Sequence, residues 1–254
     1  MESNSTYSME DKIEQTPVVI YPDINTNLPH EVTGTSFGLG ILLGVSLGSL
    51  PFMHFKPFNL YIIALALFHF LEYYITAKYN PKKVNSQSFL INNGIEYTVA
   101  HTIAIFECLV EGWLFPRWKT YNHSAFRQII VTLGLTLLIV GQLVRSLAMY
   151  TAGKSFSHIV KVEKENDHKL VTNGVYLYFR HPSYFGFFWW AMGTQLLLLN
   201  PITSVAFAYV LHGFFSKRIP FEERHLVDFF GDEYIKYRQS VKIWIPFIND
   251  DGNN

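Results

Sequence analysis

Two arginine-containing segments in the second half of the chain carry side chains suited to binding an acidic ligand. The first is Arg180-His-Pro-Ser-Tyr184-Phe-Gly186, and the second is Arg218-Ile-Pro-Phe-Glu222-Glu223. Pro182 fits the first turn of a helix, where its missing N–H costs nothing. The exposed N–H groups of such a turn can hold a carboxylate, and an arginine guanidinium binds a carboxylate in a fixed planar geometry. The two segments therefore predict an anion-binding site.

A third polar segment, His168-Lys-Leu-Val-Thr-Asn-Gly-Val-Tyr176, precedes these two. Its Thr172-Asn173-Gly174 stretch is typical of a turn, and the glycine suits a positive φ or a close approach by another group. The order of the three segments along the chain indicates that they contribute to one site.

Each segment alone also has a plainer interpretation. Arginines at helix ends commonly anchor a membrane protein at the lipid surface. Tyr176, Tyr184 and Trp244 could form an aromatic belt, and Glu222 with Glu223 could lie on a solvated face. The order and spacing of the segments, rather than any one residue, favour the functional interpretation.

Membrane helices are the elements that must position these segments. Hydrophobic residues make up 49% of the chain and charged residues only 16%, whereas a soluble domain has about 25% charged residues. Residues 32–53, 128–144 and 182–211 contain no Asp, Glu, Lys, Arg or His. Runs of about 18 or more apolar residues are typical of membrane-spanning helices. The sequence predicts an all-α, polytopic integral membrane protein with about six transmembrane segments, at 35–52, 57–77, 97–115, 126–149, 184–199 and 202–215.

The last uncharged run is predicted to fold back on itself. Asn200-Pro201 divides it into two helices, each shorter than a ~30 Å hydrocarbon core. We expect a tight helical hairpin that enters and leaves the membrane on the same side. Lysines and arginines gather in 78–95, in 150–180 and after Phe215, so the positive-inside rule places these regions in the cytosol.

The chain divides into three predicted regions. Residues 1–31 are polar and aperiodic and are expected to form a disordered cytosolic tail. Residues 32–149 are expected to form the N-terminal transmembrane helices. Residues 150–254 are expected to hold the three polar segments, the helical hairpin and a cytosolic C-terminal tail. The single Cys108 excludes an intramolecular disulfide framework.

Several residues inside the predicted spans invite a specific role. Glu72, His101 and Glu107 lie at membrane depth, where ionisable groups are costly. They are expected to pair with one another or to fill polar gaps. The first span carries a stripe of small residues that could pack within the chain or form the seam of a homodimer, at Gly40, Gly44 and Gly48.

The second half of the chain resembles the isoprenylcysteine carboxyl methyltransferase family. The resemblance covers about 110 residues in order and begins near Gly141-Gln-Leu-Val-Arg145. It includes Phe156-Ser-His158, Leu170-Val-Thr-Asn-Gly-Val-Tyr176, Phe179-Arg-His-Pro-Ser-Tyr184, Gly193-Thr-Gln195, Asn200-Pro-Ile202, Phe229-Phe-Gly231 and Pro246-Phe-Ile248. The N-terminal half matches in hydropathy more than in motif.

This resemblance implies an enzyme that methylates the C-terminal carboxylate of a prenylated cysteine, the final step of CaaX processing, with S-adenosylmethionine as cofactor. It implies that Arg218 and Arg145 hold the substrate carboxylate. It implies a cofactor pocket formed by Lys161, His168, Lys169, Leu170, Val171, Tyr176, His181, Pro182, Ser183, Tyr184 and Glu222. The family commonly has Gln at the position of Lys161.

The resemblance also implies partners and a location. The partners are proteins ending in a farnesylated or geranylgeranylated cysteine, together with membrane lipid. The implied location is the endoplasmic reticulum membrane, with the site facing the cytosol.

No basic block is longer than Lys82-Lys83, which gives no indication of nucleic-acid binding, and no two histidines have the helical spacing of a metal site.

Two other enzyme classes and one non-catalytic class compete with this interpretation. A phospholipid N-methyltransferase keeps the cofactor and methylates an amine, so it does not need two arginines directed at a carboxylate. A sterol reductase is expected to carry an acidic residue where this chain has Phe187. A lipid-binding scaffold explains the spans but not the polar segments.

Overall fold

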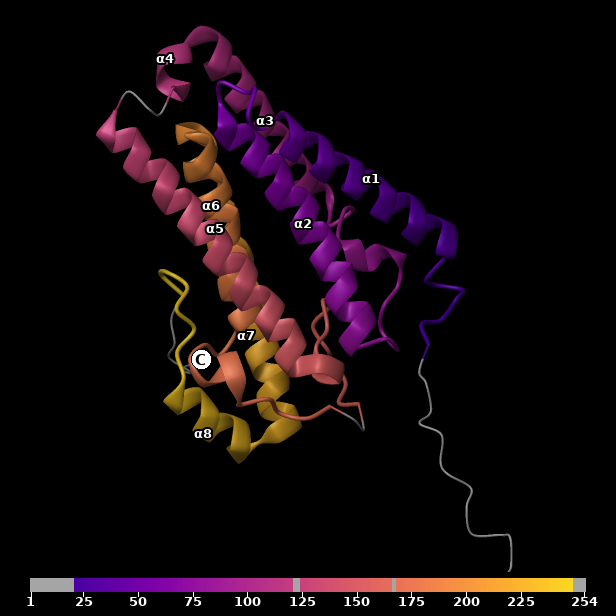
Figure 1. Cartoon of the computed structure of the whole chain (residues 1–254). Coiled ribbons are helices and arrows are strands. Elements are labelled where there is room, and N and C mark those ends of the chain that lie inside the picture. The colour runs from indigo at the N-terminus through magenta and orange to yellow at the C-terminus, as the bar shows by residue number, and fades with distance from the viewer. Residues whose placement is uncertain (1–20, 121–123, 166–167, 249–254) are drawn as a thin grey trace, which may run out of the picture.

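The computed structural model describes residues 21–120, 124–165 and 168–248. Within these residues the chain forms helices and turns without strands, so the predicted all-α fold is confirmed for them (Figure 1). The elements in chain order are α1 (Pro29–Ser49), α2 (Lys56–Tyr79), η1 (Ser86–Phe89), α3 (Ile95–Leu114), α4 (Pro116–Lys119), α5 (Ala125–Ala152), η3 (Gly153–Ser155), η4 (Gly174–Leu177), α6 (Pro182–Leu198), α7 (Pro201–Phe230) and α8 (Asp232–Ser240).

Helices α5 and α6 pack backbone against backbone (Figure 1). Glycines seven residues apart make this contact, with Gly134 and Gly141 on α5 facing Gly186 and Gly193 on α6. A Cβ at Gly141 would lie 2.5 Å from the backbone nitrogen of Trp190, which is too close for any side chain. Small residues allow this close approach between membrane helices. The pair forms the rigid scaffold beside the site.

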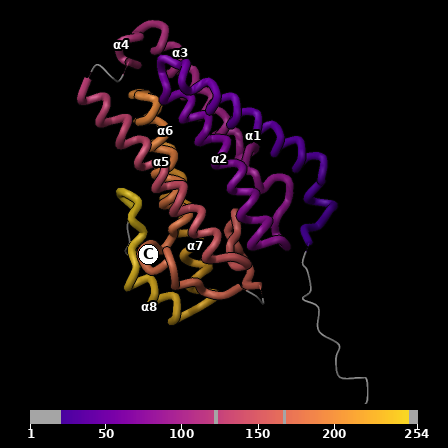
Figure 2. Tube along the Cα trace, in the orientation of Figure 1, coloured from indigo at the N-terminus to yellow at the C-terminus, as the bar shows by residue number. Residues whose placement is uncertain are grey.

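Helices α1, α2 and α3 lie beside this pair (Figure 2). Helix α2 buries Tyr61 and Phe68 completely, and the Phe68 ring stacks on Trp190 with the ring centroids 4.4 Å apart. Helix α1 packs on α2 and leaves large apolar side chains exposed, among them Phe37 and Val45. Three helical segments in the described residues are long and apolar enough to cross a membrane, namely Pro29–Ser49, Lys56–Tyr79 and Ala125–Ser155.

The turn between α6 and α7 is fixed by a buried lysine. Leu199 has a left-handed backbone with φ 56°, and Pro201 begins α7. The Lys119 ammonium donates to the Leu198 and Leu199 carbonyls at 2.8 and 3.0 Å. The same ammonium donates to the Asn200 side-chain oxygen at 2.8 Å and lies 2.8 Å from the Glu111 carboxylate. Lys119 therefore satisfies carbonyl groups that the end of α6 leaves without helical partners.

The three ionisable side chains predicted at membrane depth fill separate polar gaps. Glu107 accepts two backbone N–H groups at the start of α7, each at 2.7 Å. His101 lies with Nδ1 2.9 Å from the Tyr61 hydroxyl, and Glu72 binds a buried arginine described below. None of the three hydrogen-bonds to another of them in the described part of the chain, so of the two expected arrangements, pairing or filling polar gaps, the structure has the second.

Helix α7 does not end with the uncharged run at Phe215, where the sequence suggested the last hairpin segment would stop. It continues through Pro220 to Phe230. The reason is a continuous inward face, because Phe215, Ile219 and Glu223 are buried at four-residue spacing. The second arginine segment is therefore part of this helix rather than a loop after it.

The last part of the segment predicted as a disordered tail has a defined structure. Residues 1–20 of the predicted disordered tail lie outside the described residues. Helix α1 begins at Pro29, before the predicted boundary at residue 31. The preceding segment contacts the body of the protein, since the Thr26 carbonyl accepts from Ser86 N–H at 3.1 Å and the Asn27 side chain accepts from Tyr73 at 3.0 Å.

Candidate active site

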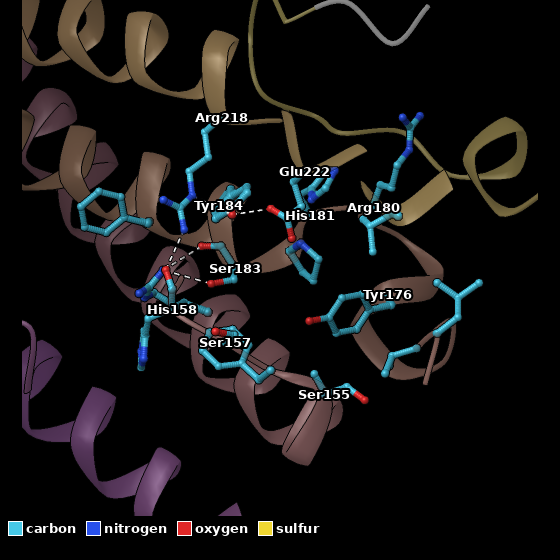
Figure 3. A pocket seen from close by; sticks show the side chains of 18 of the residues that line it. Ser155, Ser157, His158, Tyr176, Arg180, His181, Ser183, Tyr184, Arg218 and Glu222 are labelled. Atoms are coloured by element: carbon cyan, nitrogen blue, oxygen red, sulfur yellow. Dashed lines mark hydrogen bonds between the residues drawn. The ribbon is translucent and has the colours of Figure 1, made fainter. Parts of the chain in front are cut away.

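A cavity of about 210 Å³ opens where the start of α6 meets the middle of α7 and the end of α5 (Figure 3). Two irregular segments, 155–158 and 168–171, complete its wall. Polar groups line one part of the cavity, while Phe187, Phe214 and Phe215 line another. The cavity therefore offers an apolar surface next to a charged one.

The start of α6 contributes backbone groups to the cavity. Pro182 occupies the first helical turn, and no side chain caps the helix within the described residues. The Tyr184 and Phe185 N–H groups bond back to the His181 carbonyl at 3.1 and 3.0 Å. The Ser183 N–H belongs to the first turn, whose N–H groups have no partner within the helix and where the dipole favours an anion.

Arg218, Tyr184 and Glu222 form a hydrogen-bonded chain across the cavity (Figure 3). Arg218 and Glu222 stand one turn apart on α7, so they face the same way. The Arg218 Nε donates to the Tyr184 hydroxyl at 2.8 Å, and that hydroxyl donates to the Glu222 carboxylate. The remaining Arg218 contact runs to the His158 carbonyl at 2.6 Å. The Tyr184 hydroxyl thus bridges a cation and an anion on the same face of α7.

Arg145 also lines the cavity, but its guanidinium is already engaged. Its Nε and one terminal nitrogen donate to the two oxygens of the Glu72 carboxylate, the latter at 2.9 Å. Its other terminal nitrogen donates to the Ser183 hydroxyl and carbonyl at 3.0 and 3.2 Å. Arg145 therefore joins α2 to the start of α6, and its carboxylate partner in this structure is Glu72.

A buried ionic cluster supports the pocket wall from behind. The Glu223 carboxylate accepts from His181 Nε2 at 2.7 Å, from Arg180 at 3.2 Å and from the Tyr234 hydroxyl at 2.8 Å. The sequence alone left Glu223 open to a solvated position. Its spacing of four residues from the buried Ile219 is the signal that could have placed it on the inward face of α7.

His168 places an unpaired polar atom in the cavity wall. Its Nδ1 is buried and has no hydrogen-bond partner within the described residues. Burial and the nearby Lys161 and Lys83 cations lower the pKa of His168 to about 4, so the ring is neutral at pH 7. Tyr176 lies nearby, and burial raises the pKa of its hydroxyl. These two side chains offer uncharged polar contacts to a ligand.

All but one of the site residues predicted from the sequence line this cavity. Lys161 does not line it; its side chain is largely buried next to the cavity wall, and its ammonium lies 3.2 Å from the Glu165 carboxylate. The lining residues among those predicted are Arg145, His168, Lys169, Leu170, Val171, Tyr176, His181, Pro182, Ser183, Tyr184, Arg218 and Glu222. Sequence reasoning did not assign Ser155, Ser157 or His158 to the site, although His158 belongs to a quoted motif.

The fold and cavity together define a class, a helical membrane protein whose cavity lies at a helix N-terminus and is lined by arginine side chains. The model of the isoprenylcysteine carboxyl methyltransferase family matches residues 133–228, which hold most of α5, all of α6 and most of α7. A protein-S-isoprenylcysteine O-methyltransferase from Saccharomyces cerevisiae is 60% identical over 90% of this chain and 95% of its own length. The chain belongs to the isoprenylcysteine carboxyl methyltransferase family.

Two further relatives agree with this membership. The human protein-S-isoprenylcysteine O-methyltransferase is 42% identical over 85% of this chain and 72% of its own length. The solved structure of a eukaryotic intramembrane Ras methyltransferase of the same family superposes with a TM-score of 0.78 at 39% identity. That match covers 83% of this chain and 74% of the solved one. The chain therefore has the fold of an intramembrane enzyme.

Proposed function

We propose that this chain transfers a methyl group from S-adenosylmethionine to the C-terminal carboxylate of a prenylated cysteine. The observation that carries the proposal is that Arg218, Glu222 and the His181–Tyr184 corner share one cavity with an apolar wall. A lipidated acid needs a cationic partner for its carboxylate and an apolar surface for its chain. This cavity supplies both beside a helix N-terminus.

The residues of the cavity fit the cofactor. The Nδ1 of His168, which has no partner within the described residues, and the N–H groups of the first turn of α6 are polar groups that a ligand would satisfy. Glu222 is an acceptor for ligand N–H or O–H groups and also complements a cationic donor. We assign cofactor binding to His168, Lys169, Leu170, Val171, Tyr176, His181, Pro182, Ser183, Tyr184 and Glu222. Lys161 is not in this set, because its side chain lies outside the cavity.

We assign the substrate carboxylate to Arg218 alone. Within the described residues its hydrogen bonds use Nε and one terminal nitrogen, which leaves the other terminal nitrogen for a ligand, whereas the Arg145 guanidinium is bound by Glu72 and Ser183. A guanidinium fixes a carboxylate by directed hydrogen bonds. Arg218 would thereby orient the acid against the cofactor site at the start of α6.

The reaction needs orientation more than acid–base chemistry. When bound, S-adenosylmethionine supplies an electrophilic methyl group on a positively charged sulfur. The substrate carboxylate is already ionised at neutral pH, so no protein group has to remove a proton. A carboxylate oxygen bonds to the methyl carbon as the carbon–sulfur bond breaks. Holding the reacting groups in line can supply about 7–11 kcal/mol of the barrier lowering.

We further propose a membrane arrangement for the helices. The exposed apolar surface of α1 and α5 and the family membership support about six spans, with α6 and α7 as a hairpin that opens to the cytosol. Lys and Arg in the loops at the cavity end support a cytosolic site. Residues 32–149 would form the N-terminal membrane helices and residues 150–254 the catalytic region. The endoplasmic reticulum is the membrane in which we expect the chain.

A homodimer through the glycine stripe of α1 stays a prediction. A Cβ on any of these glycines would meet no atom within 4 Å, so they do not pack against the described part of the chain. The surface is open to lipid or to a second copy, at Gly40, Gly44 and Gly48.

The test is methyl transfer in membranes that contain the protein, with labelled S-adenosylmethionine and N-acetyl-S-farnesylcysteine. We expect a base-labile methyl ester and its loss in Arg218→Ala. Arg224→Ala is the matched control, because Arg224 lies on the same helix but is exposed and outside the cavity. Wild-type transfer to phosphatidylethanolamine with none to the farnesylcysteine would contradict the proposal and favour a phospholipid N-methyltransferase.

A further inference from the structure

We propose that Glu72, on α2, is a positioning residue that holds the carboxylate-binding Arg218 in place through His158 and neutralises Arg145. The inference rests on the proposed function, because it assumes that Arg218 binds the substrate acid. It assigns a role in the site to one of the N-terminal helices, which precede the segment carrying the sequence motifs.

Glu72 hydrogen-bonds to two side chains that line the cavity, Arg145 and His158. Its side chain is 1% exposed. One carboxylate oxygen accepts from the Arg145 Nε, and the other accepts from an Arg145 terminal nitrogen at 2.9 Å and from His158 Nε2 at 2.9 Å. A carboxylate so deeply buried is stable only when its oxygens are paired in this way. Removing the charge of Glu72 therefore releases two side chains that line the cavity.

The contact with His158 connects Glu72 to Arg218. The same residue whose ring donates to Glu72 presents its backbone carbonyl to the Arg218 guanidinium at 2.6 Å (Figure 3). The residue that follows α2 holds this loop a second time, because the Asn80 side chain donates to the Phe156 carbonyl at 3.0 Å. Arg218 is thus held on one side by Tyr184 of α6 and on the other by a loop that α2 fixes.

The contact with Arg145 sets the charge of the pocket. Without Glu72, two guanidinium groups would face the cavity, and a substrate acid could bind both through its two oxygens. A carboxylate held in that way is a poorer nucleophile, because both oxygens are committed to hydrogen bonds. Glu72 keeps the Arg145 guanidinium hydrogen-bonded to itself and to Ser183. The substrate acid then has one cationic partner, Arg218, and one carboxylate oxygen free to accept the methyl group.

The test compares two buried membrane carboxylates. Glu72→Gln removes the carboxylate that binds Arg145 and His158. Glu107→Gln removes a buried carboxylate that caps α7 and does not line the cavity. We expect both variants to unfold at a lower temperature. Only Glu72→Gln should lower kcat/KM for N-acetyl-S-farnesylcysteine further, by on the order of 10-fold to 100-fold, the cost of displacing a positioned group. The KM for S-adenosylmethionine should stay at the wild-type value.

A second variant keeps the inference testable if Glu72→Gln does not fold. His158→Ala leaves the Glu72–Arg145 pair in place and removes only the link to the loop. It should also raise the KM for the farnesylcysteine while leaving the KM for the cofactor unchanged. Wild-type KM values for the farnesylcysteine in His158→Ala, or equal kinetic losses in Glu72→Gln and Glu107→Gln, would overturn the inference. A wild-type enzyme that does not methylate the farnesylcysteine would instead refute the proposed function.

Discussion

The close contact between α5 and α6 makes a quantitative prediction for Gly141→Ala. The added Cβ would lie 2.5 Å from the Trp190 backbone nitrogen and 2.6 Å from the Gly186 carbonyl oxygen. Ordinary Cβ contacts begin near 3.4 Å, so the two helices would have to separate by about 1 Å in a close-packed interior. Because backbone atoms of α6 make the clash, no side-chain rotation can relieve it.

The expected cost is that of overpacking, about 1–3 kcal/mol of unfolding free energy. For a chain of this length each kcal/mol corresponds to roughly 2–4 °C in Tm. The control is Gly44→Ala, whose Cβ would meet nothing within 4 Å. It should leave Tm unchanged or raise it slightly, because Ala is favoured over Gly inside a helix by about 0.5–1 kcal/mol.

The chain provides its own reporter for this measurement. Cys108 is the single cysteine and is buried, so a thiol-reactive fluorogenic dye reports unfolding in detergent micelles. The reasoning predicts a lower Tm for Gly141→Ala than for Gly44→Ala. Indistinguishable melting curves for the two variants would show that α5 and α6 do not approach each other as described.

Further predictions concern other parts of the fold and site. Lys119→Met should lower Tm by the equivalent of about 3–5 kcal/mol, because it strands the buried Glu111 and the α6 carbonyls, yet leave both KM values unchanged. The double variant with Glu111→Gln should recover part of the loss, and a larger loss would refute this assignment. His168, with its pKa of about 4 below the unfolded value near 6.5, contributes stability that is complete above pH 6.5 and is lost as the pH falls toward 4. The Tm difference between pH 7 and pH 5 should therefore be smaller in His168→Asn, and an equal difference would contradict it. Lys161→Ala should retain the wild-type KM for S-adenosylmethionine, because the side chain lies outside the cavity; a large increase would return Lys161 to the cofactor site.

Most of the long helices could be predicted because long uncharged runs of the sequence indicate membrane-spanning helices directly. The ends of α2, α3 and α5 fall within a few residues of the predicted spans. The length of helix α7 was underestimated, since the half after Phe215 is amphipathic and hydropathy does not mark it. The glycines of α5 and α6 also have a regular spacing of seven residues, but the sequence analysis predicted a helix contact only at the glycine stripe of α1. A Cβ on that stripe would meet no atom within 4 Å.

The site residues were predicted by motif, whereas their partners were not. The cavity unites Arg218, Tyr184 and Glu222 as the motif order suggested. Pairings between distant segments leave no local signal, so the sequence could not show that Glu72 binds Arg145. For the same reason the sequence alone could not distinguish Arg145, whose guanidinium is bound by Glu72 and Ser183, from Arg218 as a carboxylate ligand.

The pairing of Arg218 with the substrate acid is the central claim, and a binding cycle tests it most directly. N-acetyl-S-farnesylcysteine and its carboxamide differ only in the ionised group, and their affinities can be measured with S-adenosylhomocysteine in place of the cofactor. The wild-type protein should prefer the acid by about 1.5–3 kcal/mol, the worth of a hydrogen bond to a charged group, which corresponds to a Kd ratio of roughly 10–150. Arg218→Ala should lose this preference while Arg224→Ala keeps it. An acid preference that survives in Arg218→Ala would contradict the account.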